Sequence, residues 1–377
     1  MKRISVVIGS RPQAVKLAPV IVACKQHRGI KTSVCVTTRR SEVVQQVLDV
    51  FGITPDADLG LKVQDRSLPV LTGKAIEAVD GYLADAKPDF VFVQSDTVTT
   101  FCSTLASFYR GVPVGQVEAG LRAGDPMVAF PEESFRILTS RLATLHFAPT
   151  DHARANLQRE HVSAGRIFVT GNTAVDALMF TLEQVRAKPP AMPGLPKGVP
   201  GSWGDAPLVL ITSHGREGFG HAFESVCKAV AELARRFEFA RFVWAVHLNP
   251  AMARPADRYF GSGGPDNVHL VEPLPYPSFV ALLDRATLVL TDSAAIQEEA
   301  PELGKPVLLM RQLTDRPEGV AAGTTKLVGT DTRTIVREVA RLLDDPDAYG
   351  AMASAPNPYG DGKASERIFE STLNFLS

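Results

Sequence analysis

Cysteine is scarce in this chain, with four among 377 residues. Cys24, Cys35, Cys102 and Cys227 show no CxxC or CxH spacing, so the sequence indicates neither a zinc site nor a disulfide framework. Isolated thiols suit a reducing compartment. We therefore expect a cytoplasmic protein without a bound metal.

A surplus of one charge and long apolar runs are also lacking. Lys and Arg number 40 and Asp and Glu 41, so the net charge of −1 provides no broad attraction to nucleic acid or to an anionic membrane. No apolar run approaches the length needed to span a bilayer, and the run within MKRISVVIGSRP is too short for a signal peptide. We expect a small-molecule partner, with no nucleic acid and no membrane.

Ten apolar runs of strand length alternate with amphipathic segments of helix length. They cover residues 4–8, 32–36, 90–93, 112–117, 167–170, 208–212, 242–246, 268–271, 287–290 and 306–310. Continuous rather than alternating apolar character indicates strands buried on both faces, as in parallel sheets covered by helices. Because 377 residues exceed one ordinary core, the pattern predicts an α/β fold with two Rossmann-like domains.

Breaks in this pattern suggest the domain limits. We predict an N-terminal domain over residues 1–170 and a C-terminal domain over 171–362, with a hinge near Gly171. The stretch 188–207 is rich in Pro and Gly and predicts a loop. A last helix within 363–377 should pack back onto one of the two domains, with the N-terminal domain as the candidate.

The first strand ends at a possible anion site. Pro12 suits the first turn of the following helix, which places Arg11 and Lys16 near a helix N-terminus. Such positions favour anions. A surface arginine is the alternative on this feature alone.

Carboxylates follow two neighbouring strands and open a later helix. Asp96 and Glu118 come directly after apolar runs, and Glu132 follows a proline at a helix start. Like charges held close together raise one another's pKa, which suits proton transfer near neutrality. The competing interpretation is that each of these residues caps a helix.

A strand, a turn of small residues and a helix recur over residues 290–299. Ser293, Ala294 and Ala295 would let backbone N–H groups approach a diphosphate closely. Glu299, with Glu298 as second choice, could accept hydrogen bonds from ribose hydroxyls. Helix capping is the alternative, and capping and binding are compatible.

Two histidines follow strands of the second domain. His214 can donate or accept a proton near pH 7. His247 is a weaker candidate for the substrate site, because a single histidine at a strand end is more often structural. Neither histidine belongs to a cluster with the ligand count of a metal site.

In this order, these elements resemble the non-hydrolysing UDP-N-acetylglucosamine 2-epimerases. The similarity covers nearly the whole chain, and many collinear segments make it specific. The segments are GSRPQAVKLAPV, SDTVTTFCSTLASFYRGVPVGQVEAGLRAGD, FPEES, FAPT, GNTAVDAL, HLNP, LTDSAAIQEEAPELGKPVL, RPEGVAAGTTKLVGTD and NPYGDGKASERI.

The resemblance implies a glycosyltransferase-B-like arrangement with a cleft between the domains, a homodimer, and no metal or nicotinamide cofactor. It also implies C2 epimerisation of UDP-GlcNAc to UDP-ManNAc through 2-acetamidoglucal and UDP. By motif position, the catalytic or sugar-side residues are Arg11, Lys16, Asp96, Glu118, Glu132 and His214. The matching UDP-binding residues are Ser293, Glu299 and Arg316.

The chain departs from the family pattern at several places. The family's usual segments are GTRPE, HGDT, HVEAG and DSGG. In this chain Gln13 replaces the Glu of the first, Gln94 and Gln116 replace the His of the second and third, and Ala294 and Ala295 replace the two Gly of the fourth. These changes affect the expected rate and the sugar variant more than UDP binding.

A further departure concerns segments associated in the family with an activating second UDP-GlcNAc. Gln-His-Arg-Glu is replaced by residues 39–42, Arg-Arg-Ser-Glu, and His-Arg-Arg-Glu by residues 214–217, His-Gly-Arg-Glu. We expect allosteric activation to be altered or absent. Drift on an exposed loop is the alternative.

Other functions remain open from the sequence. The chain could act on a modified UDP-diacetamido sugar or hydrolyse its substrate to ManNAc and UDP. Outside that class, it could be a weakened nucleotide-sugar sensor or a glycosyltransferase of the same layout.

Overall fold

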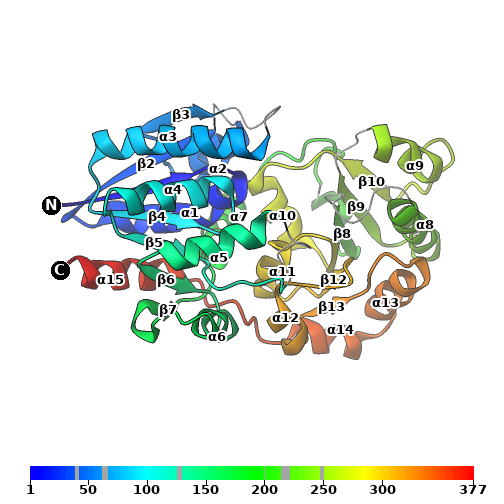
Figure 1. The fold of residues 1–377 in the computed structure, drawn as a ribbon. Helices are drawn as coiled ribbons and strands as arrows, with labels where there is room; N and C mark the ends of the chain where they lie inside the picture. The colour runs from blue at the N-terminus through cyan, green and yellow to red at the C-terminus, as the bar shows by residue number, and fades with distance from the viewer. Residues whose placement is uncertain (39–41, 62–66, 125–129, 200, 214–220, 247–249) are drawn as a thin grey trace. The chain divides into compact units, whose positions relative to one another are not determined.

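The computed structural model describes residues 1–377 except 39–41, 62–66, 125–129, 200, 214–220 and 247–249. The chain forms two compact units (Figure 1). Unit 1 contains Met1–Met179 and Tyr359–Ser377, and unit 2 contains Phe180–Pro358. The sequence patterns predict changes at 170/171 and 362/363 instead. The chain first passes from unit 1 to unit 2 between Met179 and Phe180. This boundary lies inside one helix, Thr173–Ala187, so no loop marks it.

Unit 1 is built on a seven-stranded parallel sheet in the order β3-β2-β1-β4-β5-β6-β7. The first strand of the chain lies inside this sheet and is paired on both sides, since Val6 lies beside Val34 in β2 and Phe92 in β4. The strands are β1 (Lys2–Ile8), β2 (Ile30–Thr38), β3 (Ala57–Leu61), β4 (Phe90–Gln94), β5 (Val114–Val117), β6 (Leu145–Ala148) and β7 (Ile167–Val169).

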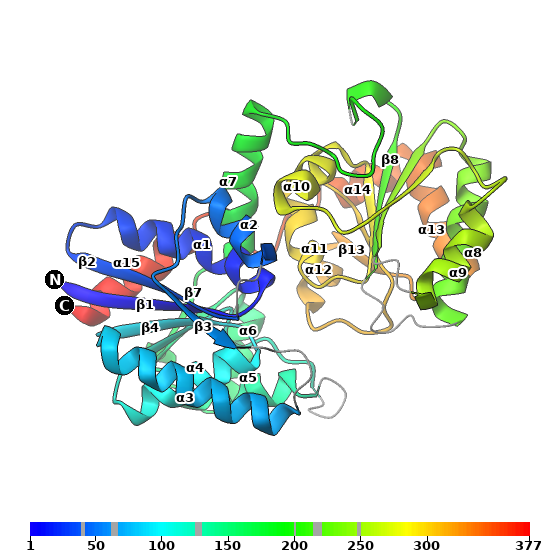
Figure 2. The same ribbon diagram turned by 90° about the horizontal axis from the view of Figure 1, so that it is seen from above.

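Helices cover both faces of this sheet. Figure 2 shows α1, α2 and α15 on one face and α3, α4 and α5 on the other. The helices are α1 (Arg11–Gln26), α2 (Glu42–Val50), α3 (Leu68–Ala86), α4 (Val98–Tyr109), α5 (Glu132–Leu142), α6 (Asp151–Arg159), η1 (Ala164–Arg166), α7 (Thr173–Ala187) and α15 (Ala364–Leu376). The sheet is thus buried on both sides, as its continuous apolar strands predict.

The chain end belongs to unit 1. Helix α15 packs against α1, with the rings of His27 and Phe369 5.4 Å apart between their centroids. The backbone N–H of Asn172 donates to the carbonyl of Tyr359 over 2.7 Å, so the two stretches that lead to unit 2 are joined beside α7. Helix α15 is therefore part of unit 1.

Unit 2 repeats the architecture with a six-stranded parallel sheet in the order β10-β9-β8-β11-β12-β13. Its strands are β8 (Leu208–Ser213), β9 (Arg241–Val246), β10 (Val268–Val271), β11 (Leu288–Thr291), β12 (Val307–Leu309) and β13 (Thr325–Leu327). Its core packs Phe242 and Trp244 against apolar side chains of α8 and α13. The stretch that leads into β8 contains η2 (Gly201–Trp203) and is otherwise irregular, as the Pro and Gly content predicts.

The helices of unit 2 also lie on both faces of their sheet. In Figure 2, α8, α9 and α13 lie on one side and α10, α11 and α12 on the other. The helices are α8 (His221–Arg236), α9 (Pro250–Phe260), α10 (Tyr276–Arg285), α11 (Ile296–Glu299), η3 (Ala300–Leu303), α12 (Pro317–Ala322), α13 (Thr332–Asp344) and α14 (Pro346–Ala353). The predicted α/β class with two Rossmann-like folds is confirmed. Within the described part of the chain, no helix has both the length and the apolar character to cross a bilayer.

Candidate functional site

Two strands of unit 1 end in residues with unusual backbone conformations. Ser95 follows β4 with φ 64°, and Glu118 follows β5 with φ 59°. Positive φ is uncommon for residues other than glycine and often marks functional positions. Because the backbone N–H of Ser95 also donates to the carbonyl of Val117 over 3.2 Å, both chain reversals occur side by side at the C-terminal edge of the sheet.

The carboxylate of Glu118 is buried and collects three donors. The Lys16 ammonium of α1 and the Gln94 amide of β4 donate to Oε1 and Oε2 respectively. Asn172 Nδ2 donates to Oε1 over 3.1 Å. Both members of the Lys16–Glu118 ion pair are almost fully buried, so the pair lies in a medium where charge interactions are strong.

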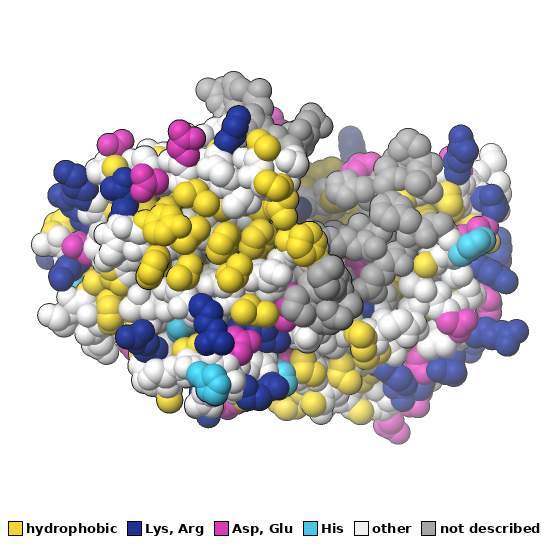
Figure 3. Space-filling view, in the orientation of Figure 1, with side chains coloured by type: hydrophobic (Ala, Val, Ile, Leu, Met, Phe, Trp, Pro, Cys, Tyr) yellow, Lys and Arg dark blue, Asp and Glu magenta, His cyan; other side chains and the backbone are white. Residues whose placement is uncertain are grey.

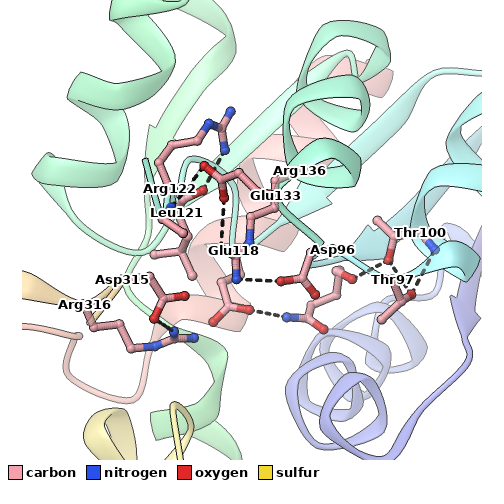
Figure 4. A network of polar contacts seen from close by, with 12 residues as sticks. Asp96, Thr97, Thr100, Glu118, Leu121, Arg122, Glu133, Arg136, Asp315 and Arg316 are labelled. Carbon is pink, nitrogen blue, oxygen red and sulfur yellow. Dashed lines mark hydrogen bonds and ion pairs between the residues drawn. The ribbon is translucent and has the colours of Figure 1, made fainter. Parts of the chain in front are cut away.

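Asp96 is held by an arginine that the sequence analysis did not select. Arg136 Nη2 lies 2.6 Å from Asp96 Oδ2, and Arg136 Nη1 lies 3.2 Å from Glu133 Oε2. Glu133 Oε1 in turn accepts the backbone N–H of Ala123 over 3.0 Å. Figure 4 shows this network, which connects the start of α5 to the end of β4. A signal was available, because Arg136 lies one turn after two glutamates that open a helix.

The turn after β1 is tied to the same edge by Gln13. Its Oε1 accepts the backbone N–H of Gly9 over 2.8 Å, and its Nε2 donates to the carbonyl of Gln94 over 2.8 Å. Ser10 caps α1 and Thr97 caps α4 through their hydroxyl oxygens. These bonds fix the start of α1, the helix that carries Lys16, and the loop that carries Asp96.

Arg11 and Glu132 are the first residues of α1 and α5, and both are partly buried. Lys16, Asp96 and Glu118 therefore lie at one edge of the sheet, and the helices that begin at Arg11 and Glu132 adjoin it.

In unit 2, the Ser293 turn follows β11 as the sequence predicts. The backbone N–H of Ser293 donates to Thr291 Oγ1 over 2.9 Å. Ala294 and Ala295 complete the turn, and α11 begins after Ala295, which makes no side-chain capping bond.

The two glutamates of α11 have different partners. Glu299 is buried, and its Oε1 accepts a hydrogen bond from the Tyr276 hydroxyl over 3.1 Å. Glu298 Oε1 lies 2.5 Å from Nε of Arg316, and both side chains are buried. Arg316 Nη1 also lies 2.7 Å from Asp315 Oδ1. No local pattern in the sequence indicates Tyr276, which lies 23 residues before its partner.

Two predicted residues, His214 and His247, lie outside the described residues, as do residues 39–41 and 215–217. Over the described ranges, no three His, Cys, Asp or Glu side chains are grouped so that they could hold a metal ion. The four cysteines are free and buried, and burial raises the pKa of each thiol to about 12. They therefore carry no thiolate chemistry near neutrality.

The sequence of this chain is similar to those of known proteins of one family. The family model for UDP-N-acetylglucosamine 2-epimerase matches residues 22–373. The chain is 46% identical over 372 residues to the UDP-N-acetylglucosamine 2-epimerase of Escherichia coli K12, covering 99% of this chain and 98% of that protein. It is 44% identical over 375 residues to the enzyme of the same name from Bacillus subtilis, covering 99% and 96%.

Solved structures give the same result. The UDP-GlcNAc 2-epimerase of Neisseria meningitidis, bound to UDP-GlcNAc, has a TM-score of 0.90 at 41% identity and covers 99% of this chain and 100% of that one. A calicheamicin glycosyltransferase, at 15% identity and a TM-score of 0.58 over 100% and 98% of the two chains, shares the fold alone. The chain belongs to the UDP-N-acetylglucosamine 2-epimerase family.

Proposed function

We propose that this protein interconverts UDP-GlcNAc and UDP-ManNAc by inverting the sugar at C2. The observation that carries the proposal is the buried Lys16–Glu118 pair beside Asp96 at the ends of adjacent strands. Family membership supports the substrate. Four free, buried cysteines fit a reducing cytoplasm.

The reaction we propose is an elimination followed by re-addition. A carboxylate takes the proton from C2, the C2–H electrons form a C1=C2 double bond, and the anomeric C–O bond breaks with its electrons passing to UDP. Return of UDP to C1 and delivery of a proton to the opposite face of C2 give the epimer. We assign the proton transfers to Asp96, Glu118 and Glu132, since carboxylates are suitable acids and bases.

Cationic groups stabilise the departing diphosphate in this proposal. Arg11 begins α1, and a helix N-terminus together with a guanidinium favours anionic oxygens. Lys16 adds a further positive charge at the same edge of the sheet. We assign His214 to the leaving-group charge as well, on its sequence position alone.

Unit 2 supplies the UDP-binding residues in this proposal. Glu299 accepts hydrogen bonds from the ribose hydroxyls, a role supported by the Tyr276 hydroxyl, which donates to Glu299 Oε1 and so orients the carboxylate. Glu298 is less suited, because it is paired with Arg316. The remaining binding residues we propose are Ser293, Ala294, Ala295, Arg316 and His247 of unit 2 and Arg11 of unit 1.

The decisive experiment follows C2 of the sugar by NMR while the protein is incubated with UDP-GlcNAc in deuterated water. We expect deuterium at C2 and accumulation of UDP-ManNAc without net loss of nucleotide sugar. The matched control is Asp96→Asn, which keeps the size of the side chain but removes its charge. Release of free ManNAc and UDP would identify a hydrolase, and an inert wild-type protein would identify a sensor. Either result overturns the proposal.

We also propose that the protein is a homodimer. The face of unit 1 formed by α3, α4 and α5 exposes large apolar side chains, and Figure 3 shows hydrophobic residues gathered there. They include Val70, Phe108, Tyr109 and Leu138. Contiguous exposed apolar surface is typical of protein interfaces.

A further inference from the structure

We infer that Gln94 is a positioning residue that orients the carboxylate of Glu118 for its work at C2, which rests on the function proposed above. Gln94 is the last residue of β4 and is buried. Its Nε2 donates to Glu118 Oε2, the oxygen opposite the one that Lys16 and Asn172 contact. Gln94 thus donates to the second oxygen of this carboxylate, where it can orient the group.

The oxygen of the Gln94 side-chain amide, Oε1, lies in a different environment from Nε2. Across the part of the chain that the structure describes, Gln94 Oε1 is a buried acceptor with no hydrogen-bond partner. Such an atom destabilises a fold, because it gives up hydration without compensation. Oε1 therefore contributes nothing favourable to stability, and the hydrogen bond from Nε2 to Glu118 accounts for the placement of the side chain.

The backbone of Gln94 is held in place by two hydrogen bonds. Its carbonyl accepts Gln13 Nε2 over 2.8 Å and Thr100 Oγ1 over 2.6 Å. On the other side, the positive φ of Glu118 holds that residue in an uncommon conformation. Both partners of the contact are thus fixed by the surrounding structure, which is what precise placement of a reacting carboxylate requires.

The chemistry of the amide matters as well as its position. An amide donates without titrating, so the hydrogen bond to Glu118 persists over the whole working range of pH. Hydrogen bonds donated to a carboxylate favour its ionised form, the form that can accept a proton. A group that titrated at position 94 would make the orientation of Glu118 depend on pH.

Two substitutions test this inference. Gln94→Leu removes the donor and the unpartnered acceptor together. We expect kcat to fall on the order of 10- to 100-fold with KM within about two-fold, because the carboxylate is misaligned while UDP contacts persist. We also expect a lower Tm, because the buried Glu118 carboxylate loses a donor. A merely structural role would lower Tm in the same way but would leave kcat unchanged below the transition.

Gln94→Glu keeps the size of the side chain and tests the charge. Two carboxylates in contact cannot both ionise easily, so they share a proton. We expect kcat to be low at neutral pH and to recover as pH falls, whereas the wild-type profile has no such recovery. This variant also keeps the inference testable if Gln94→Leu does not fold.

The matched control is Asn267→Leu, at another buried amide. Asn267 Nδ2 donates only to backbone carbonyls, those of Ala234, Phe237 and Ala240. We expect a lower Tm and an unchanged kcat below the transition. If the wild type exchanges C2 hydrogen and both Gln94 variants keep wild-type kcat and pH profile, the inference fails and the proposed function stands. If the wild type shows no exchange, the proposed function itself fails.

Discussion

Asp176 of α7 caps a helix that begins 188 residues later in the chain. Its Oδ1 accepts the backbone N–H of Ser365 over 2.7 Å and the Ser365 hydroxyl over 2.6 Å, and its Oδ2 accepts the backbone N–H of Ala364 over 3.2 Å. Lys363, the residue before α15, makes no capping bond of its own. A tertiary contact therefore satisfies the first N–H groups of the C-terminal helix.

Asp176→Ala should lower the free energy of unfolding by about 1–2 kcal/mol, since it removes the side chain that caps α15. Urea denaturation followed by circular dichroism measures the change. Asp151→Ala is the control, because that carboxylate is exposed and pairs with Arg154 on the surface. Equal stability of Asp176→Ala and the wild type would show that α15 needs no cap.

Asp176 should also make stability depend on pH. Burial raises the pKa of this carboxyl above its ordinary value of 3.8, and the hydrogen bonds from Ser365 only partly oppose the rise. The folded state therefore binds the proton more tightly than the unfolded chain. The contribution of Asp176 is fully present below pH 3.8 and is lost as pH rises through the raised pKa. Denaturation at several acidic pH values should show this loss in the wild type and not in Asp176→Asn.

Arg316→Leu should lower the free energy of unfolding by about 3–5 kcal/mol, because it takes the guanidinium away from the buried Glu298 carboxylate. The double variant with Glu298→Leu should be less destabilised than the sum of the two single changes. A double-mutant cycle from denaturation midpoints measures this coupling. Strict additivity would mean that the pair does not interact.

Tyr276→Phe should weaken UDP binding by about 3- to 10-fold, the range expected when one hydrogen bond is lost. Without the hydroxyl, Glu299 is oriented less firmly for the ribose. Isothermal titration with UDP gives the dissociation constant. Tyr349→Phe in α14 is the control and should bind as the wild type does. Unchanged affinity in Tyr276→Phe would remove Tyr276 from the site.

Phe108→Lys should convert a dimer to a monomer, because it places a charge in the exposed apolar face of α3, α4 and α5. Sedimentation velocity distinguishes the two states. Val320→Lys changes an exposed apolar residue of unit 2 and should leave the dimer intact. A monomeric wild type would refute the proposed assembly.

The rate of epimerisation should rise hyperbolically with UDP-GlcNAc. The expectation rests on the sequence alone, since Arg39, Arg40 and Gly215 replace residues associated with activation in the family. Initial rates over a wide range of substrate concentration check it. Marked sigmoidicity would show that activation is retained.

Local sequence predicted ten of the strands, because strands buried on both faces have continuous apolar character. Three strands lack that signal. β3 has alternating exposure and includes Gly60 with φ 65°, β6 is four residues long and contains His146, and β13 has three residues. They form strands because a neighbouring strand offers backbone partners, as β2 does for β3. Pairing of this kind depends on the assembled sheet.

The sequence by itself determined the alternation of strands and helices and the position of Asp96 and Glu118 after neighbouring apolar strands. Local chain order sets these features, since each acid directly follows a strand. Only the tertiary structure decided that the Glu118 carboxylate accepts hydrogen bonds from Lys16, Gln94 and Asn172. These residues lie 102, 24 and 54 positions away in the chain. The physical reason is the strand order β1-β4-β5, which brings distant loops to one sheet edge and which no local pattern encodes.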